Sequence, residues 1–406
     1  MKVTITPRKL SGTIQVPPSK SQAHRLIIGA ALANGTSHIH NLAHSQDICA
    51  TLECMTQLGA IESQGGAVVT GIGRSRPSTG ILPVLDCGES GSTIRFLMPV
   101  ALAVASGGMF RGRGRLMERP YKPYEDIFTR QNITFTRQPG QITLSGTLKP
   151  GRFELPGDVS SQFITGLLYA LPLLEGDSEL VLTTPLESKG YVELTLEALA
   201  QFGIVAHPTE TGWKVPGSQV GHPADVTVEG DYSQASNYLV AASMGNSLTV
   251  TGLSTSSAQG DRIICDYARQ LDGTGTVILS VRQCPDLVPA LAVRAALRAG
   301  ETTHIVDAAR LRLKESDRLE AVTAELNKLG AQVEQTPDAL IIHGVSRLHG
   351  GNCDSHGDHR IAMMLAVAAT CANGVVEVTG AESVAKSYPN FWEDYEQLGG
   401  TIARTE

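Results

Sequence analysis

The sequence predicts an α/β protein whose helices are buried and whose sheets lie outside them. Six segments each begin with a small or acidic polar residue, continue as an apolar stretch rich in alanine and leucine, and end at or near glycine. Most of the segments between them end a helix at glycine or asparagine and then alternate around a polar turn, which indicates a β-hairpin. The repeated unit is therefore helix, strand, helix and hairpin. Helices this apolar are expected to pack inside a layer of sheet.

The six apolar segments recur at intervals of about 70 residues, with one shorter interval before the fifth. A repeat of this length is too long for a solenoid, and six copies in register are hard to ascribe to chance. Residues that mark the starts of the segments are Ser21, Ser90, Ser160, Ser233, Asp286 and Asp358. Hairpins are expected in the segments that follow, including "YARQLDGTGTVILSV" after the fourth apolar helix.

Composition excludes several classes of protein. The chain has 406 residues, 42% of them apolar and 18% charged, which suits two or three globular domains with sizeable cores. A formal net charge of −7 argues against a general nucleic-acid or membrane-surface partner. The start of the chain lacks the apolar core of a signal peptide, and the apolar runs are too short to span a bilayer. Seven scattered cysteines without a C-x-x-C pair suggest reduced thiols and a cytoplasmic location.

The stretch "PPSKSQAHR" places Lys20, Ser21 and Arg25 on the first turns of a helix. One interpretation is ordinary capping by Ser19 or Ser21 with a solvated basic face. The other is an anion site, because the free N–H groups at a helix start attract phosphate or carboxylate. If the apolar helices run parallel within each half of the chain, their N-termini gather at one end and suit a ligand with several negative charges.

Charged and polar residues cluster at these helix starts and in the loops between them. Arginines and lysines together with paired acids indicate clamps for phosphoryl and carboxylate groups beside an acid–base pair. The set comprises Lys20, Arg25, Arg95, Arg119, Ser160, Ser161, Gln162, Asp286, Lys314, Glu315, Asp317, Arg318, Asp358, His359, Arg360 and Lys386.

Seven motifs in order, "PSKSQAHR", "GESGSTIRF", "RLMERP", "GDVSSQF", "RLKESDR", "GDHRIAM" and "AKSYPNF", closely resemble the EPSP synthases, the 3-phosphoshikimate 1-carboxyvinyltransferases. The resemblance covers nearly the whole chain. It implies a two-domain inside-out α/β barrel in which each domain contains three βαβαββ repeats. The implied domains are residues 1–18 with 229–406, carrying acid–base and phosphoenolpyruvate groups, and residues 19–228, carrying shikimate-phosphate groups. The implied active site lies in the cleft between them.

The resemblance implies a reaction of the shikimate pathway of aromatic amino-acid biosynthesis. The enolpyruvyl group of phosphoenolpyruvate moves to the 5-hydroxyl of shikimate 3-phosphate by addition and elimination of phosphate. The implied catalytic residues are Asp286 as hydroxyl-proton acceptor, with Lys20, Glu315 and Lys386 near the enol. The implied shikimate 3-phosphate residues are Lys20, Ser21, Arg25, Ser160, Ser161, Gln162, Ser188, Tyr191, Asp286 and Lys314. The implied phosphoenolpyruvate residues are Lys20, Gly91, Arg119, Gln162, Arg318, Arg360 and Lys386.

Several of these positions have simpler interpretations. Asp286 suits an N-cap, and Glu315 with Arg318 suits a surface ion pair at i,i+3 spacing. Gly91 suits a plain turn, although the resemblance favours close approach of its backbone to phosphoenolpyruvate. Glu89 and Arg310 depart from the family pattern, so no role is assigned to them.

Parts of the sequence are compatible with other functions. The UDP-N-acetylglucosamine enolpyruvyl transferases carry a Lys-Asn pair at the first helix and commonly a cysteine before the Arg-Pro, and this chain has Lys20-Ser21 and "RGRGRLMERP" instead. A metal-dependent phosphohydrolase built on "CDSHGDHR", and a non-catalytic module that binds anions or RNA ends, are weaker alternatives. We expect no metal or organic cofactor, no nucleic-acid or membrane partner, two small-molecule substrates and a monomer.

Overall fold

The computed structural model describes residues 1–75 and 80–405. These residues form two compact units, one made of residues 1–17 with 230–406 and the other of residues 18–229. We call the first the discontinuous unit and the second the continuous unit. Each unit has its own apolar core, built from its own helices and the inner faces of its own sheets.

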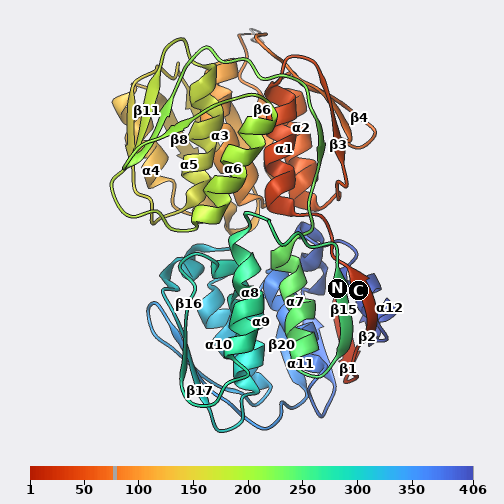
Figure 1. Ribbon diagram of the computed structural model, residues 1–406. Helices are drawn as coiled ribbons and strands as arrows, with labels where there is room; N and C mark the ends of the chain where they lie inside the picture. The colour runs from red at the N-terminus through yellow and green to blue at the C-terminus, as the bar shows by residue number, and fades with distance from the viewer. Residues whose placement is uncertain (76–79, 406) are drawn as a thin grey trace. The chain divides into compact units, whose positions relative to one another are not determined.

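The described part of the continuous unit is built from three four-stranded sheets and a set of central helices (Figure 1). In each sheet the first two strands are parallel and the last two form an antiparallel hairpin. The helices are α1 (Lys20–Leu32), α2 (Gln46–Gln57), α3 (Gly91–Ala105), α4 (Lys122–Arg130), α5 (Ser161–Ala170) and α6 (Lys189–Gln201). The first sheet joins β14 (Asp225–Thr227), β3 (Thr36–His40), β5 (Val68–Thr70) and β4 (Ile61–Ser63), in that order. The second joins β6 (Val84–Asp86), β7 (Gly107–Arg111), β9 (Gln141–Ser145) and β8 (Thr134–Gln138), and the third β10 (Arg152–Leu155), β11 (Ser178–Leu182), β13 (Gly212–Val215) and β12 (His207–Pro208).

The discontinuous unit repeats this pattern with two changes at its sheets. Its helices are α7 (Tyr232–Ser243), α8 (Ile264–Gln270), α9 (Val288–Ala296), α10 (Arg318–Lys328), α11 (His359–Ala369) and α12 (Phe391–Gln397). One sheet has the same strand order, with β16 (Val277–Ser280), β17 (Thr302–Val306), β19 (Leu340–His343) and β18 (Gln332–Gln335). The next contains β20 (Gly351–Asp354), β21 (Val376–Thr379), β1 (Lys2–Thr6) and β22 (Thr401–Thr405), and the last only β15 (Ser247–Thr251) and β2 (Ser11–Gln15).

The first change is that strand β1, at the start of the chain, completes the last repeat. It pairs antiparallel with both β21 and β22, so it occupies the place that the second hairpin strand holds in the other four-stranded sheets. The second change corrects a prediction: the fourth repeat has no hairpin. The segment after α8 forms only β16, and this strand pairs in parallel with β17 as the first strand of the next sheet. The fourth repeat is the shortest, and its chain leaves room for one strand there.

The chain passes between the two units twice, and each time the strand before the passage is paired within the unit that the chain is leaving. Strand β2 pairs in parallel with β15 before the chain enters α1, and β14 pairs in parallel with β3 before the chain enters α7. The two passing segments are hydrogen-bonded to each other. Ser19 N donates to the Glu229 carbonyl at 2.7 Å, and Asp231 N donates to the Pro17 carbonyl at 2.9 Å.

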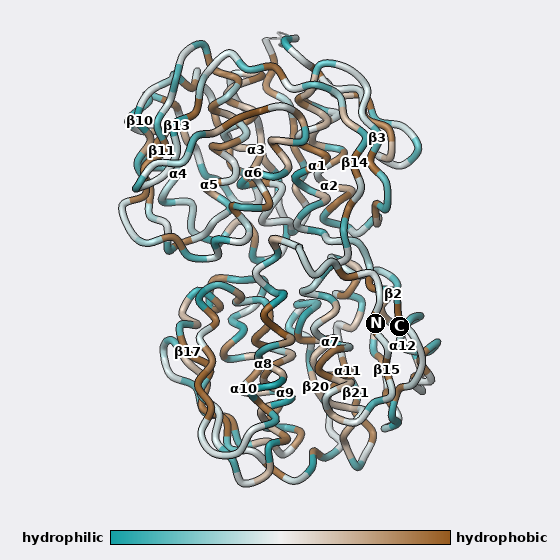
Figure 2. The backbone as a smooth tube through the Cα atoms, viewed as in Figure 1, coloured by the Kyte–Doolittle hydropathy of each residue, from teal (hydrophilic) through white to brown (hydrophobic). Residues whose placement is uncertain are grey.

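The apolar helices are buried, as the sequence predicts. Every residue of α11 is buried, and so is every residue of α1 from Gln22 to Leu32. A helix that is apolar all round can be stable only in an interior, so the sheets cover these helices. Figure 2 shows hydrophobic colour along the inner helices of each unit and hydrophilic colour on the outer loops. Within the described chain, none of the helices has the length and apolar character that a membrane crossing requires.

The role of β1 gives a first prediction. Ile5 is fully buried and lies between Val376 and Ile402 of the neighbouring strands. Ile5→Ala is expected to lower the free energy of unfolding of the discontinuous unit by about 2–5 kcal/mol, through lost burial and the cavity left behind. Thr4→Ala, on the other face of the same strand, is the matched control and is expected to change it by less than about 0.5 kcal/mol. Urea unfolding measures both, and equal effects would contradict the assigned register.

Candidate active site

Serine side chains cap the first helix of each repeat in the continuous unit. Ser19 Oγ accepts from Gln22 N at 3.4 Å, Ser90 Oγ from Thr93 N at 3.2 Å, and Ser160 Oγ from Gln162 N at 3.3 Å. Ser19, and not Ser21, is therefore the cap of α1. Capping leaves the remaining N–H groups of each first turn available to an anion.

A cluster of cationic and amide groups surrounds the start of α3. A Cβ at Gly91 would lie 2.6 Å from Arg119 Nη1 and 3.6 Å from Gln162 Oε1. Gln162 Oε1 accepts from Arg95 Nη1 at 2.7 Å, and Gln162 Nε2 donates to Ser92 Oγ at 3.1 Å. The guanidinium of Arg119 thus occupies the space that a side chain at position 91 would need. A Cβ there would displace the end of the Arg119 side chain, so glycine at this position allows the guanidinium to lie against the start of α3.

Arg25 is almost completely buried, at 2% exposure, and its guanidinium is fixed by neutral groups. Its Nε donates to Thr195 Oγ1 at 2.8 Å and its Nη2 to the Tyr191 carbonyl at 2.9 Å. The guanidinium also stacks on Phe96, with Cζ 5.1 Å from the ring centroid. Burial lowers the pKa of Arg25 to about 10, so it remains a cation at neutral pH. A buried cation held mainly by neutral groups retains a strong attraction for an anion.

The other expected residues of this unit lie around the same helix starts. Lys20 Nζ forms an ion pair with Asp47 Oδ2 at 2.8 Å, between the first turns of α1 and α2. Ser21 contributes its carbonyl to Arg25 Nη1. Ser161 begins α5 beside its capping residue, and Ser188 precedes α6 in the left-handed conformation, with φ of 56°.

In the discontinuous unit, one buried arginine joins three carboxylates. Arg318 is 1% exposed and begins α10. Its Nη1 lies 2.8 Å from Asp286 Oδ1, its Nη2 2.7 Å from Glu315 Oε2, and its Nε 2.8 Å from Asp358 Oδ2. The Glu315–Arg318 pair predicted at i,i+3 spacing is present, but Arg318 is buried, Glu315 is only partly exposed, and the pair belongs to a network. The expectation of a solvated surface pair is therefore wrong.

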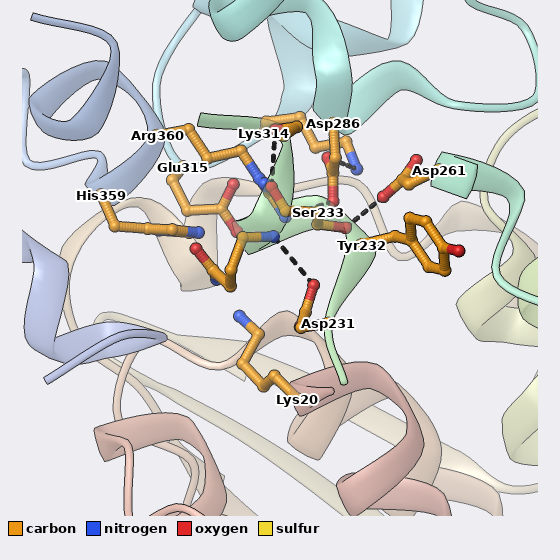
Figure 3. A network of polar contacts seen from close by, with 12 residues as sticks. Lys20, Asp231, Tyr232, Ser233, Asp261, Asp286, Lys314, Glu315, His359 and Arg360 are labelled. Atoms are coloured by element: carbon orange, nitrogen blue, oxygen red, sulfur yellow. Dashed lines mark hydrogen bonds and ion pairs between the residues drawn. The ribbon is translucent and has the colours of Figure 1, made fainter. Parts of the chain in front are cut away.

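Asp286 in turn contacts three cations. Its Oδ1 accepts from Arg318 and from Lys314 Nζ at 3.3 Å, and its Oδ2 from Arg360 Nη2 at 3.0 Å (Figure 3). Burial alone raises the pKa of Asp286, but Arg360, Lys314 and Arg318 outweigh it and hold that pKa well below its ordinary value. Asp286 lies in the turn Pro285–Leu287, and no side chain caps α9. The N-cap interpretation of Asp286 is wrong.

Residues at the start of α11 form further hydrogen bonds with this network. Asp358 is fully buried, caps α11 through the Arg360 N–H at 2.9 Å, and accepts from Ser316 Oγ at 3.0 Å. Lys386 Nζ donates to the Gly357 carbonyl at 2.7 Å, in the loop before Asp358. Burial raises the pKa of Asp358, but Arg318 and His359 more than compensate and lower it overall.

The residues of "CDSHGDHR" do not gather around a metal position. His356 Nε2 lies 2.7 Å from the buried Glu325 carboxylate, and Asp358 forms an ion pair with Arg318. The backbone places Cys353 on β20, whereas His359 follows on α11. In residues 1–75 and 80–405, no group of three or more His, Cys, Asp or Glu side chains has an arrangement that suits a metal ion.

The fold is that of the enolpyruvyl transferases. The chain aligns over 99% of its length with the EPSP synthase structure from Acinetobacter baumannii, over all of that chain, with a TM-score of 0.80 at 24% identity. It aligns over its whole length with 98% of the enolpyruvyl transferase NikO from Streptomyces tendae, with a TM-score of 0.78 at 18% identity. The predicted fold class is confirmed.

The sequence comparisons identify the family. Residues 5–395 match the family model of EPSP synthase (3-phosphoshikimate 1-carboxyvinyltransferase). The 3-phosphoshikimate 1-carboxyvinyltransferase of Clostridium kluyveri is 45% identical over 98% of both chains, and that of Clostridioides difficile is 43% identical over 98% of this chain and 97% of its own. The chain belongs to the EPSP synthase family. The predicted family and the predicted activity, that of a 3-phosphoshikimate 1-carboxyvinyltransferase, are confirmed.

Sequence reasoning does not single out two acidic residues of these clusters. Asp47, paired with Lys20, sits near a helix start in "HSQDICA", a position that capping alone explains. Asp261 lies in "AQGDRI", outside every motif of the resemblance, yet it is buried beside Asp286. Only the packing of the repeats brings these carboxyl groups to the cations.

The Arg318 network gives a second prediction. Asp358→Asn is expected to lower the free energy of unfolding by about 3–5 kcal/mol at pH 7, because it removes one partner of a buried ion pair. The pKa of Asp358 is lowered in the fold, so its stabilisation is complete above the unfolded value of about 4 and is lost as pH falls through the folded value. The difference between wild type and variant should therefore shrink below about pH 4. Denaturant unfolding from pH 8 to 3 measures it, and a constant difference would contradict the ionic origin.

Proposed function

We propose that the two clusters provide the substrate-binding and catalytic groups of the family reaction on this chain. The observation that carries the proposal is the coordination of Asp286 by Lys314, Arg318 and Arg360. A buried carboxylate among three cations, next to a second acid in Glu315, suits a reaction that joins two anionic substrates and moves protons between them.

The chemistry assigns Asp286 the proton of the 5-hydroxyl of shikimate 3-phosphate. As the hydroxyl oxygen attacks the central carbon of phosphoenolpyruvate, the O–H bond breaks and the proton passes to Asp286. Three neighbouring cations weaken this carboxylate as a base in the empty protein. An anionic substrate that binds to those cations offsets part of their charge, and the proton affinity of Asp286 rises in the complex. The base is then strengthened only when substrate is present.

Protonation of the enol carbon needs an acid that faces the other end of phosphoenolpyruvate. Glu315, Lys20 and Lys386 are the candidates. Glu315 is bound to Arg318, which stabilises its carboxylate; Lys20 and Lys386 are ammonium groups that can donate a proton or orient the phosphate. A proton then leaves the methyl group of the tetrahedral intermediate as its C–O bond to phosphate breaks, which restores the C=C bond and yields 5-enolpyruvylshikimate 3-phosphate and inorganic phosphate.

Substrate recognition follows from the fixed cations. Arg119 beside Gly91, together with Arg360, is assigned to phosphoenolpyruvate, because a guanidinium fork matches carboxylate and phosphate. Arg25, Lys20, Ser21, Ser160, Ser161, Gln162, Ser188 and Tyr191 are assigned to shikimate 3-phosphate, with Lys314 beside Asp286. Tyr191 acts on Arg25 through its backbone carbonyl. Arg318, with three carboxylate partners, organises Asp286 and Glu315, and its charge also favours phosphoenolpyruvate.

We also propose that the chain works as a cytoplasmic monomer. Every assigned residue comes from one chain, and its seven cysteines are unbridged thiols, as expected in a reducing compartment. Size-exclusion chromatography with light scattering tests the monomer, and a stable dimer would contradict it.

The basic test of the activity is release of phosphate that requires phosphoenolpyruvate and shikimate 3-phosphate together.

A third prediction concerns the proton acceptor. Asp286→Asn keeps the shape of the side chain and removes its charge. It is expected to lower kcat by about two to four orders of magnitude, the usual weight of a general base. The dissociation constant for shikimate 3-phosphate, measured by calorimetry, should change much less. A well-folded Asp286→Asn protein with nearly normal kcat would remove Asp286 from the mechanism.

A fourth prediction concerns the phosphoenolpyruvate clamp. Arg119→Ala is expected to raise KM for phosphoenolpyruvate by a factor equivalent to about 2–5 kcal/mol, and Arg119→Lys to restore only part of it. Gly91→Ala should raise the same KM, because its methyl group displaces the Arg119 guanidinium. Gly221→Ala is the matched control, because Gly221 has no positive φ and a Cβ there would meet its nearest neighbour, Ala33, only at 3.4 Å; it should leave KM unchanged. Steady-state kinetics decide, and an unchanged KM in Arg119→Ala would contradict the assignment.

A further inference from the structure

A buried carboxyl group that the reaction above does not use lies next to Asp286. Asp261 is 2% exposed and belongs to the short helical turn Gly260–Ile263. Ser233 Oγ, on the first turn of α7, donates a hydrogen bond to Asp261 Oδ2. Figure 3 shows the Asp261 side chain directed toward Ser233, on the same side of the network as Asp286.

Hydrogen bonds fasten the segment that carries Asp261 to the start of α7. Gln259 Oε1 accepts from Tyr232 N at 2.9 Å, and Gln259 Nε2 donates to the Gly230 carbonyl at 2.8 Å. Tyr232 Oη donates to the Ser254 carbonyl at 3.0 Å. These contacts hold the segment at both ends, so Asp261 cannot turn outward to water without breaking them.

The surroundings of Asp261 are mostly negative or neutral. Burial, and after it the charge of Asp286, raise the pKa of Asp261 to about 6, against the opposing effects of Arg360 and the Ser233 hydrogen bond. This carboxyl group therefore changes charge near neutral pH, whereas Asp286 stays ionised. The charged, titratable and hydrogen-bonding groups that face it are Asp231 and Ser233 of the α7 start, Cys284 and Asp286 of the segment before α9, and Arg360 of α11.

A second carboxylate at this place has a chemical consequence. Lys314, Arg318 and Arg360 stabilise the charged form of Asp286 and so reduce its affinity for a proton. A negative charge fixed behind Asp286 acts in the opposite sense, because two neighbouring carboxylates disfavour each other's ionisation. Being buried, this charge acts with little screening by solvent or salt.

We propose that Asp261 is a positioning residue whose buried negative charge, fixed by Ser233, keeps Asp286 basic enough to accept the hydroxyl proton of the substrate. The proposal rests on the proposed role of Asp286. Asp261 touches neither substrate and takes up no proton in the reaction. It acts through the charge it adds behind the Asp286–Arg360 pair.

The decisive variant is Asp261→Asn, which keeps the shape and the acceptor for Ser233 and removes the charge. Its single-turnover rate constant at pH 8 is expected to be about 10-fold below that of wild type, with KM for both substrates within about 2-fold. As pH falls from 8 to 5, Asp261 of the wild type becomes protonated and its charge disappears. The ratio of wild-type to variant rates should therefore decrease toward 1 across a window centred near pH 6.

Ser233→Ala is the matched variant. It removes the donor that stabilises the Asp261 carboxylate, so the pKa of Asp261 should rise. The rate at pH 8 should equal that of wild type, and the acidic limb of the rate–pH profile should move to higher pH. A merely structural role of Asp261 would not move this limb. If Asp261→Asn fails to fold, as judged by its melting temperature, the Ser233→Ala profile decides alone.

The outcomes separate this inference from the proposed function. A rate ratio that is the same at pH 5 and pH 8, or a Ser233→Ala profile that superimposes on that of wild type, overturns the role of Asp261. If Asp286→Asn is as active as wild type, the proposed function itself is wrong. If Asp286→Asn is inactive and the pH dependences are absent, only the inference about Asp261 fails.

Discussion

The discontinuous unit depends on the burial of one guanidinium, that of Arg318, among Asp286, Glu315 and Asp358. An uncompensated charge at this depth would be strongly destabilising, so each carboxylate is needed to hold the cation, and the cation fixes each carboxylate in return. The arrangement joins the starts of α10 and α11 to the turn before α9. It therefore sets the positions of Asp286 and Glu315, the proposed acid–base pair, as a consequence of satisfying a buried charge.

The continuous unit holds a buried cation in a different way. The Arg25 guanidinium is held by hydroxyl and carbonyl oxygens and by the face of Phe96. Neutral partners fix the geometry of a guanidinium without cancelling its charge. One unit therefore carries preorganised positive charge for anionic groups, and the other carries paired charges suited to proton transfer.

The repeat architecture explains why these groups occur at helix starts. The first helix of a repeat begins at a side-chain cap in α1, α3, α5, α7 and α11, though not in α9, and the N–H groups left in its first turn suit anions. The sheets cover the apolar helices from outside. At each of the two passages between units, the preceding strand stays paired in the unit that the chain leaves, and the next helix belongs to the other unit. Strand β2 before α1 and strand β14 before α7 show this. The first strand, β1, takes the place of a hairpin strand in the last repeat. The sheet of that repeat is therefore complete only when β1 pairs with β21 and β22 from the C-terminal end of the chain.

The sequence by itself determined the repeat, the buried helices, the family and most of the charged residues, because these follow from periodicity and from motifs of adjacent residues. It could not determine what each charge meets. The same residue types are compatible with capping, a surface pair or a metal site, and distances between repeats decide among them. Only the tertiary structure placed Asp286 among three cations, Arg119 in the space above Gly91, and Asp261 behind Asp286. The physical reason is that charge interactions depend on separation and burial in space, and a linear sequence specifies neither until the helices pack.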